Sequence, residues 1–244
     1  MRKFCQAMPS MPAILATGSV CAAAIFSWAA VAPSSQLFGP TIRRTGDTSA
    51  MALTFDDGPN PTVTPALLDL LDRHHAKATF FLIGQRVRAF PDLAKEIAAR
   101  GHVVGNHTDT HPGLVFLSSR RITAEFDRCD DALALAVGHR AQWLRPPYGF
   151  RGPQLDAIVR RRDSGARVVM WSIAAWDWKP QPAEPVITRL RRARGGDIVL
   201  LHDGDHRAGE GDRRHTVMAL AYWLPRWKDE GLRFVSLDDC GKQN

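Results

Sequence analysis

At residues 51–59 the chain reads MALTFDDGP, a short apolar run that ends in two adjacent acids and a turn signal. The apolar part has the length and composition of a buried β-strand, and Gly-Pro is typical of a turn. Asp56 and Asp57 therefore stand where a strand ends, a place where one acid could bind a metal ion and the other accept protons. A plain polar turn would use the same residues, so the function of this stretch depends on what else the chain brings to it.

Seven short apolar runs alternate with amphipathic segments along the chain. This alternation predicts right-handed βαβ units, and hence either a parallel barrel or an open doubly wound sheet. Strands are expected at residues 51–55, 78–83, 102–105, 141–144, 167–172, 198–201 and 232–236. Helices are expected at residues 61–75, 91–100, 118–137, 153–163, 182–194 and 214–230, several of them opened by proline.

Polar side chains directly after the predicted strands favour the barrel. In a (β/α) barrel the carboxyl ends of the strands meet on one face, where such folds place their active sites. An open sheet would concentrate function at its switch point, and no glycine-rich phosphate loop follows the first strand. We therefore predict an α/β fold, a (β/α) barrel of about seven parallel strands in a single domain. The residues that this fold would bring together are Asp56, Asp57, His107, Arg145, Asp177 and His202.

Two histidines four residues apart, His107 and His111, form a second constellation. On a helical turn they would project from one side and bind one ion through two imidazole nitrogens. Asp57 could supply a third ligand and leave a position open for water. Two histidines, one carboxylate and an open position describe a catalytic site for zinc or a similar divalent transition metal.

The N-terminus has the pattern of an export signal or a short membrane anchor, because Arg2 and Lys3 precede an apolar stretch at residues 11–32. Cleavage after Ala29 would suit the small residues there, whereas retention would attach the protein to a membrane, since the stretch approaches the ~20 residues that span a bilayer. The protein would then be exported, and would be periplasmic, extracellular or anchored facing outward. We predict a signal peptide or anchor at residues 1–32, a linker at 33–48, the enzymatic domain at 49–239 and a tail at 240–244.

The composition is that of a globular protein long enough for one sizeable core, with 244 residues, 45% of them hydrophobic and 23% charged. The formal net charge of +7 could favour an anionic polymer or membrane, although solvated helix faces explain it as well. No zinc-finger spacing or RNA-binding aromatic signature accompanies the charge, so we expect no nucleic-acid partner, and we expect a monomer. Outside the export segment the cysteines are Cys129 and Cys240, which could pair after export or stay separate.

The two constellations resemble the first two motifs of the NodB-homology polysaccharide deacetylases, carbohydrate esterase family four. Residues 54–59, TFDDGP, are similar to the first motif, and residues 107–112, HTDTHP, to the second. Further stretches resemble the other motifs in order along the chain: RPPYG at 145–149, WDW at 176–178 and LLHD at 200–203. The resemblance implies a distorted (β/α) barrel that removes N-acetyl groups from N-acetylated sugars of a cell-wall or extracellular polysaccharide, peptidoglycan or a chitin-like polymer, and releases acetate.

The same resemblance implies roles for the residues of the first three motifs. Asp57, His107 and His111 would hold one divalent transition metal ion, zinc in the first place, with cobalt or another divalent ion as alternatives. Asp56, which stays free of the ion, would take a proton from the attacking water. Arg145 would orient that carboxylate, unless it only anchors a loop.

The later motifs would supply the acid and the contacts to the substrate. His202 would protonate the departing amine, and Asp177 would orient His202 and favour its charged form. Loop structure or core packing is the competing interpretation for the three residues that would contact the sugar. These are Tyr148, through its backbone N–H at the oxyanion, Trp178, which with Trp176 would wall the pyranose site, and Leu200 in the pocket for the acetyl methyl group.

One position departs from the family pattern. Ala174 stands where the fourth motif commonly carries another aspartate, three residues before Asp177, which leaves the detailed support of the site open. Two alternatives remain at this point, a pseudoenzyme that binds glycans without cleaving them and a hydrolase of a small amide or acetyl ester. The presence of Asp56 and His202 beside the expected ligands argues against the pseudoenzyme.

Overall fold

The computed structural model describes residues 23–162 and 165–240. Most of the predicted export signal or anchor, residues 1–22, and most of the predicted tail, residues 241–244, lie outside this part. Residues 23–31 form a helix. Within the described ranges no helix combines the length and the apolar character that crossing a bilayer requires.

One sheet organises the described part of the chain, and every pairing between its strands is parallel. The strand order is β1-β6-β5-β4-β3-β2-β8-β7, and β9 pairs with β2 outside this path. The strands are β1 (Thr41–Ile42), β2 (Ala50–Gly58), β3 (Ala78–Leu82), β4 (Val103–Asn106), β5 (Trp143–Leu144), β6 (Arg167–Val169), β7 (Ile173–Ala174), β8 (Ile198–His202) and β9 (Arg233–Phe234).

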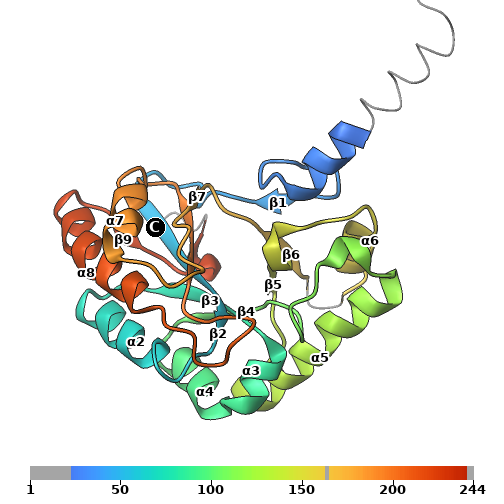
Figure 1. The fold of residues 1–244 in the computed structure, drawn as a ribbon, viewed down its shortest axis with the longest axis horizontal. Coiled ribbons are helices and arrows are strands. Elements are labelled where there is room, and N and C mark those ends of the chain that lie inside the picture. The colour runs from blue at the N-terminus through green and yellow to red at the C-terminus, as the bar shows by residue number, and fades with distance from the viewer. Residues whose placement is uncertain (1–22, 163–164, 241–244) are drawn as a thin grey trace, which may run out of the picture.

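The predicted distorted (β/α) barrel is confirmed, as a sheet that curls into a half-barrel with helices on its outer side (Figure 1). All six predicted helices are present. Besides the helix at residues 23–31, the described part of the chain has a short additional one, α3, whose six residues are too few to show a helical period. The helices are α2 (Thr64–Arg73), α3 (Gly84–Ala89), α4 (Pro91–Ala99), α5 (Ser119–Val137), α6 (Gln154–Arg160), α7 (Ala183–Leu190) and α8 (Arg214–Asp229).

Two segments differ from the sequence-based prediction. The strand expected at residues 167–172 ends at Val169, and the chain turns to form β7, because β7 pairs with β8 whereas β6 pairs with β5. The segment expected as a linker, residues 33–48, contains β1, which extends the sheet beside β6. Cys129 and Cys240, for which pairing was left open, are both free.

The side chains of the central strand β2 point alternately to the two faces of the sheet. Met51, Leu53 and Phe55 pack in the main core beneath the helices, and the rings of Phe55 and Phe80 stack with their centroids 4.9 Å apart. Alternate residues of a strand point to opposite faces, so Thr54 and Asp56 face the inside of the half-barrel. The strand thus delivers a carboxylate to the interior at its carboxyl end.

Candidate active site

Two neighbouring carboxylates reach one cleft because the backbone of β2 is irregular at its end. Regular alternation would send Asp56 and Asp57 to opposite faces. The register of β2 against β3 shifts between Asp56 and Gly58, and Asp57 has a left-handed φ of 72°. Such a conformation costs about 1–3 kcal/mol in a non-glycine residue, and its position here beside a cleft is typical of a functional site.

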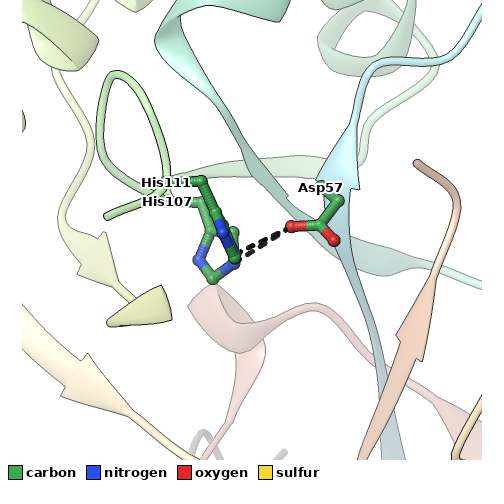
Figure 2. A group of neighbouring side chains, drawn as sticks. All are labelled: Asp57, His107 and His111. Atoms are coloured by element: carbon green, nitrogen blue, oxygen red, sulfur yellow. Dashed lines mark ion pairs between the residues drawn. The ribbon is translucent and has the colours of Figure 1, made fainter. Parts of the chain in front are cut away.

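Two histidines approach the second carboxylate (Figure 2). The Nε2 atom of His111 lies 3.1 Å from Oδ1 of Asp57, and the Nε2 atom of His107 lies 3.5 Å from the same oxygen. The Nδ1 atom of His107 is 2.7 Å from the carbonyl oxygen of Arg145, to which a neutral ring donates its Nδ1–H. That hydrogen bond leaves the lone pair of Nε2 directed toward Asp57, as a ligand to an ion requires.

The prediction that the two histidines lie on a helical turn is wrong, since residues 107–113 form an irregular loop. Thr108 and His111 both have left-handed φ values, of 67° and 60°. The Oδ1 atom of Asn106 accepts from the N–H of Thr108, and the Oγ1 atom of Thr108 accepts from the N–H of His111. These side-chain contacts compete with helical hydrogen bonding, and the loop that they support places the rings of His107 and His111 side by side.

The three side chains fit a divalent transition metal. Their ligand atoms lie within 4.8 Å of one another, and all three residues are buried. The Oδ1 atom of Asp57 is buried without a hydrogen-bond partner, a costly state that a bound cation would relieve. Burial lowers the pKa of His111, which favours the neutral ring that a ligand needs. Burial would raise the pKa of Asp57, but contacts with neighbouring histidines hold it well below its usual value.

A buried ion pair holds the other carboxylate. The Nη1 atom of Arg145 lies 2.8 Å from Oδ1 of Asp56 and donates to Oγ1 of Thr54 at 2.7 Å. Arg145 is fully buried. The second oxygen of Asp56, Oδ2, lies 3.7 Å from Nε2 of His107, and Asp56 therefore lies beside the three candidate ligands without being one of them.

A histidine–carboxylate pair approaches from β8. The Nδ1 atom of His202 lies 2.8 Å from Oδ1 of Asp177. The other oxygen of Asp177, Oδ2, accepts from the backbone N–H of His202 and from the hydroxyl of Thr216. Burial lowers the pKa of His202, but the charge and hydrogen bond of Asp177 outweigh it and raise that pKa to about 9. His202 therefore carries a proton at neutral pH.

A cleft of about 680 Å3 joins these groups, a volume in the usual range for ligand sites. The structure places all the predicted site residues together: Asp56, Asp57, His107, His111, His202, Tyr148, Trp178 and Leu200 line the cleft, and Arg145 and Asp177 lie directly behind it. Core packing was the competing interpretation for the tryptophans, but Trp176 and Trp178 are 57% and 39% exposed in the cleft.

His206 lies in the same cleft and was missed by the sequence analysis. Its Nδ1 atom is 3.5 Å from Oδ2 of Asp57, its ring stacks on that of His111 at 4.3 Å, and its Nε2 is 3.2 Å from the hydroxyl of Tyr148. The available signal was another pair of histidines four residues apart, His202 and His206, in a polar stretch of sequence.

Comparisons with known proteins agree with this geometry. The family model for polysaccharide deacetylase matches residues 43–164. A peptidoglycan-N-acetylglucosamine deacetylase of Bacillus cereus is 39% identical over 199 residues, which cover 78% of this chain and 86% of that protein. A chitooligosaccharide deacetylase of Azorhizobium caulinodans is 35% identical over 209 residues, which cover 82% of this chain and 99% of that protein.

Solved structures show the same fold. A peptidoglycan N-acetylglucosamine deacetylase superposes with a TM-score of 0.73 at 33% identity, over 83% of this chain and 90% of that one. A pseudoenzyme of carbohydrate esterase family 4 from Bacillus anthracis also superposes with a TM-score of 0.73, at 27% identity, over 82% of this chain and 70% of that one. Sequence, fold and relatives agree, and the chain belongs to the polysaccharide deacetylase family, carbohydrate esterase family 4.

Proposed function

We propose that the protein is a metal-dependent hydrolase that removes N-acetyl groups from N-acetylated sugars of peptidoglycan or a chitin-like polysaccharide. The observation that carries this proposal is the convergence on one cleft of three side chains that could hold a metal ion, a separate carboxylate and a histidine paired with a carboxylate. The relatives named for peptidoglycan and for chitooligosaccharides support the substrate class.

The chemistry divides between the ion and the residues around it. Asp57, His107 and His111 would hold a divalent ion, which would supply Lewis acidity to the acetamide carbonyl and to the attacking water. Asp56 takes a proton from the attacking water through Oδ2, because Arg145 fixes its other oxygen. Water thereby adds to the carbonyl carbon.

The departing nitrogen needs a proton, because an amide anion is a very poor leaving group. His202 donates that proton as the carbon–nitrogen bond breaks, and Asp177 stabilises the imidazolium before the transfer. Acetate and a free amino sugar result. We assign the backbone N–H of Tyr148 to the oxyanion, the ring of Trp178 to the pyranose face, and Leu200 to the acetyl methyl group, since all three residues line the cleft.

Export forms part of the proposal. The basic and apolar N-terminus supports it, and so does the peptidoglycan named for the relatives, because that polymer lies outside the cytoplasmic membrane. Membrane attachment through the same segment and a monomeric state are proposed with it.

Acetate release tests the proposal. Purified protein is depleted of metal, reloaded with zinc or cobalt, and incubated with N-acetylglucosamine oligomers, peptidoglycan and small acetylated amides and esters. We expect metal-dependent acetate release from the oligomers or from peptidoglycan. Glycan binding without acetate release would indicate a pseudoenzyme, like the structural relative from Bacillus anthracis, and turnover of the small compounds alone would indicate a different hydrolase.

A further inference from the structure

The end of the N-terminal helix and the residues that follow it lie against the catalytic domain and reach its cleft. Val31 and Pro33 line the same cleft as the metal ligands, together with Phe150 and Trp171. Val31 and Pro33 precede residue 43, where the match to the family model begins. Part of the cleft wall therefore comes from a stretch that the sequence analysis expected to be an export segment and a linker.

A buried arginine clamps this segment in place. Arg151 is fully buried, and its guanidinium donates to the carbonyl oxygens of Ser35 at 2.8 Å and Ala32 at 2.5 Å. Its backbone N–H donates to the carbonyl oxygen of Ala30 at 2.9 Å. Three hydrogen bonds from one residue to three carbonyls fix the course of the segment, and the two from the charged guanidinium are of the stronger kind.

Apolar anchors on both sides of the clamp reinforce it. Ala29 and Ala30 are buried and pack with Phe38, which lies on the other side of the clamped turn. Arg151 itself comes three residues after Tyr148, in the loop that follows β5. The clamp thus ties the position of the segment to the loop that we assign to the oxyanion.

We propose that residues 30–35 form a sugar subsite of this enzyme, in which Val31 and Pro33 contact the apolar face of a pyranose that flanks the reacting N-acetyl sugar. The inference rests on the proposed function, because it takes the occupant of the cleft to be a glycan chain. Val31 is half exposed, so an apolar surface is presented to the cleft where a sugar can cover it. Pyranose rings carry apolar C–H faces, and their burial against apolar side chains is favourable.

Chain-length dependence tests the subsite. Val31→Asp and Pro33→Ser are compared with wild type on N-acetylglucosamine dimer and tetramer and on a small aryl acetate. We expect KM for the tetramer to rise by roughly fivefold or more, with kcat within about twofold and the aryl acetate almost unaffected, because only the longer glycan covers the wall. The matched control is Leu37→Ser, since Leu37 is an exposed apolar residue of the same segment that does not line the cleft.

Loss of the clamp gives an independent variant. Arg151→Met should raise KM for the tetramer in the same way, and its thermal melt shows whether the domain still folds. Equal effects on all substrates, or no effect of Val31→Asp on the tetramer, would overturn the subsite. If wild type releases no acetate from any glycan, the proposed function fails, and calorimetric binding of the tetramer to wild type and Val31→Asp then decides the subsite alone. Equal binding, or no binding to either, would overturn it.

Discussion

Replacement of Asp177 by asparagine should move the alkaline limit of activity by more than two pH units. Asp177 is fully buried and contacts Nδ1 of His202 at 2.8 Å. Asparagine keeps the size of the side chain but removes its charge. The substitution therefore isolates the electrostatic support of the residue that we assign as the general acid.

The magnitude follows from the pKa of His202. Its rise from 6.5 to about 9 corresponds to ~3 kcal/mol in favour of the protonated ring. Without the charge of Asp177, burial lowers this pKa toward 6.5 or below. At pH 8 the protonated fraction would then fall from roughly 0.9 to roughly 0.03, a loss of about 30-fold. Asp56 and Asp57 also raise the pKa of His202, and a cation held by Asp57 would offset that effect. The quantity to compare is therefore the difference in alkaline limit between wild type and Asp177→Asn.

The assay is kcat/KM for acetate release from N-acetylglucosamine oligomers between pH 5 and 10. Because the acid form of His202 is required, wild-type activity falls as pH rises through about 9, and the variant loses activity from about 6.5 upward. The matched control is Thr216→Val, which removes one hydrogen bond to Asp177 but no charge, and its alkaline limit should move by less than about half a pH unit. An alkaline limit unchanged in Asp177→Asn would refute the assignment of His202.

Three further predictions concern the same site. Asp56→Asn should retain one bound ion per chain by elemental analysis while kcat falls ~10²–10⁴-fold, whereas Asp57→Asn should lose the ion. Ion loss in Asp56→Asn would show that the two acids are assigned the wrong way round. Arg145→Met should lower the unfolding free energy by about 3–5 kcal/mol, because it leaves Asp56 buried without its partner. The loss caused by Arg145→Met should be smaller when Asp56→Asn is already present, and an equal loss in both backgrounds would mean that the pair is not coupled. Since the pKa of His202 is raised, its contact with Asp177 stabilises the fold fully below pH 6.5, and this contribution is lost as pH rises through about 9. The difference in unfolding free energy between wild type and Asp177→Asn should therefore shrink over that window, and a difference that grows with pH would contradict the pairing.

The sequence predicted the strands and the residues at their ends because both carry strong local signals. The run at residues 51–55 is apolar except for Thr54, as expected for a strand buried on both faces, and β2 is buried along its whole length. Polar residues after successive strands predicted the shared face without any knowledge of side-chain positions. The site therefore followed from topology.

Backbone irregularities were not predictable, although the site depends on them. Asp57, Thr108, His111, Tyr148 and Trp176 all have left-handed φ values, and none of them is a glycine. Local preference disfavours each of these conformations, so only the surrounding packing and hydrogen bonds can impose them. This is why the spacing of His107 and His111 predicts a helical turn where the structure has a loop. The contributions of His206 and of Val31 to the cleft were missed for a related reason, since both depend on contacts between segments far apart in the chain.

Arg145 supports Asp56 although position 174 carries an alanine. A buried guanidinium is costly if its donors lack acceptors. Here Nε and Nη2 of Arg145 donate to the carbonyl oxygens of Val169 and Met170, and Nη1 donates to Asp56 and to a threonine hydroxyl. Each nitrogen therefore has an acceptor, and Ala174 lines the cleft instead. The support of Asp56 by Arg145 is therefore intact in this chain. Because Ala174 lines the cleft, we expect it to affect which glycan binds rather than the chemical step.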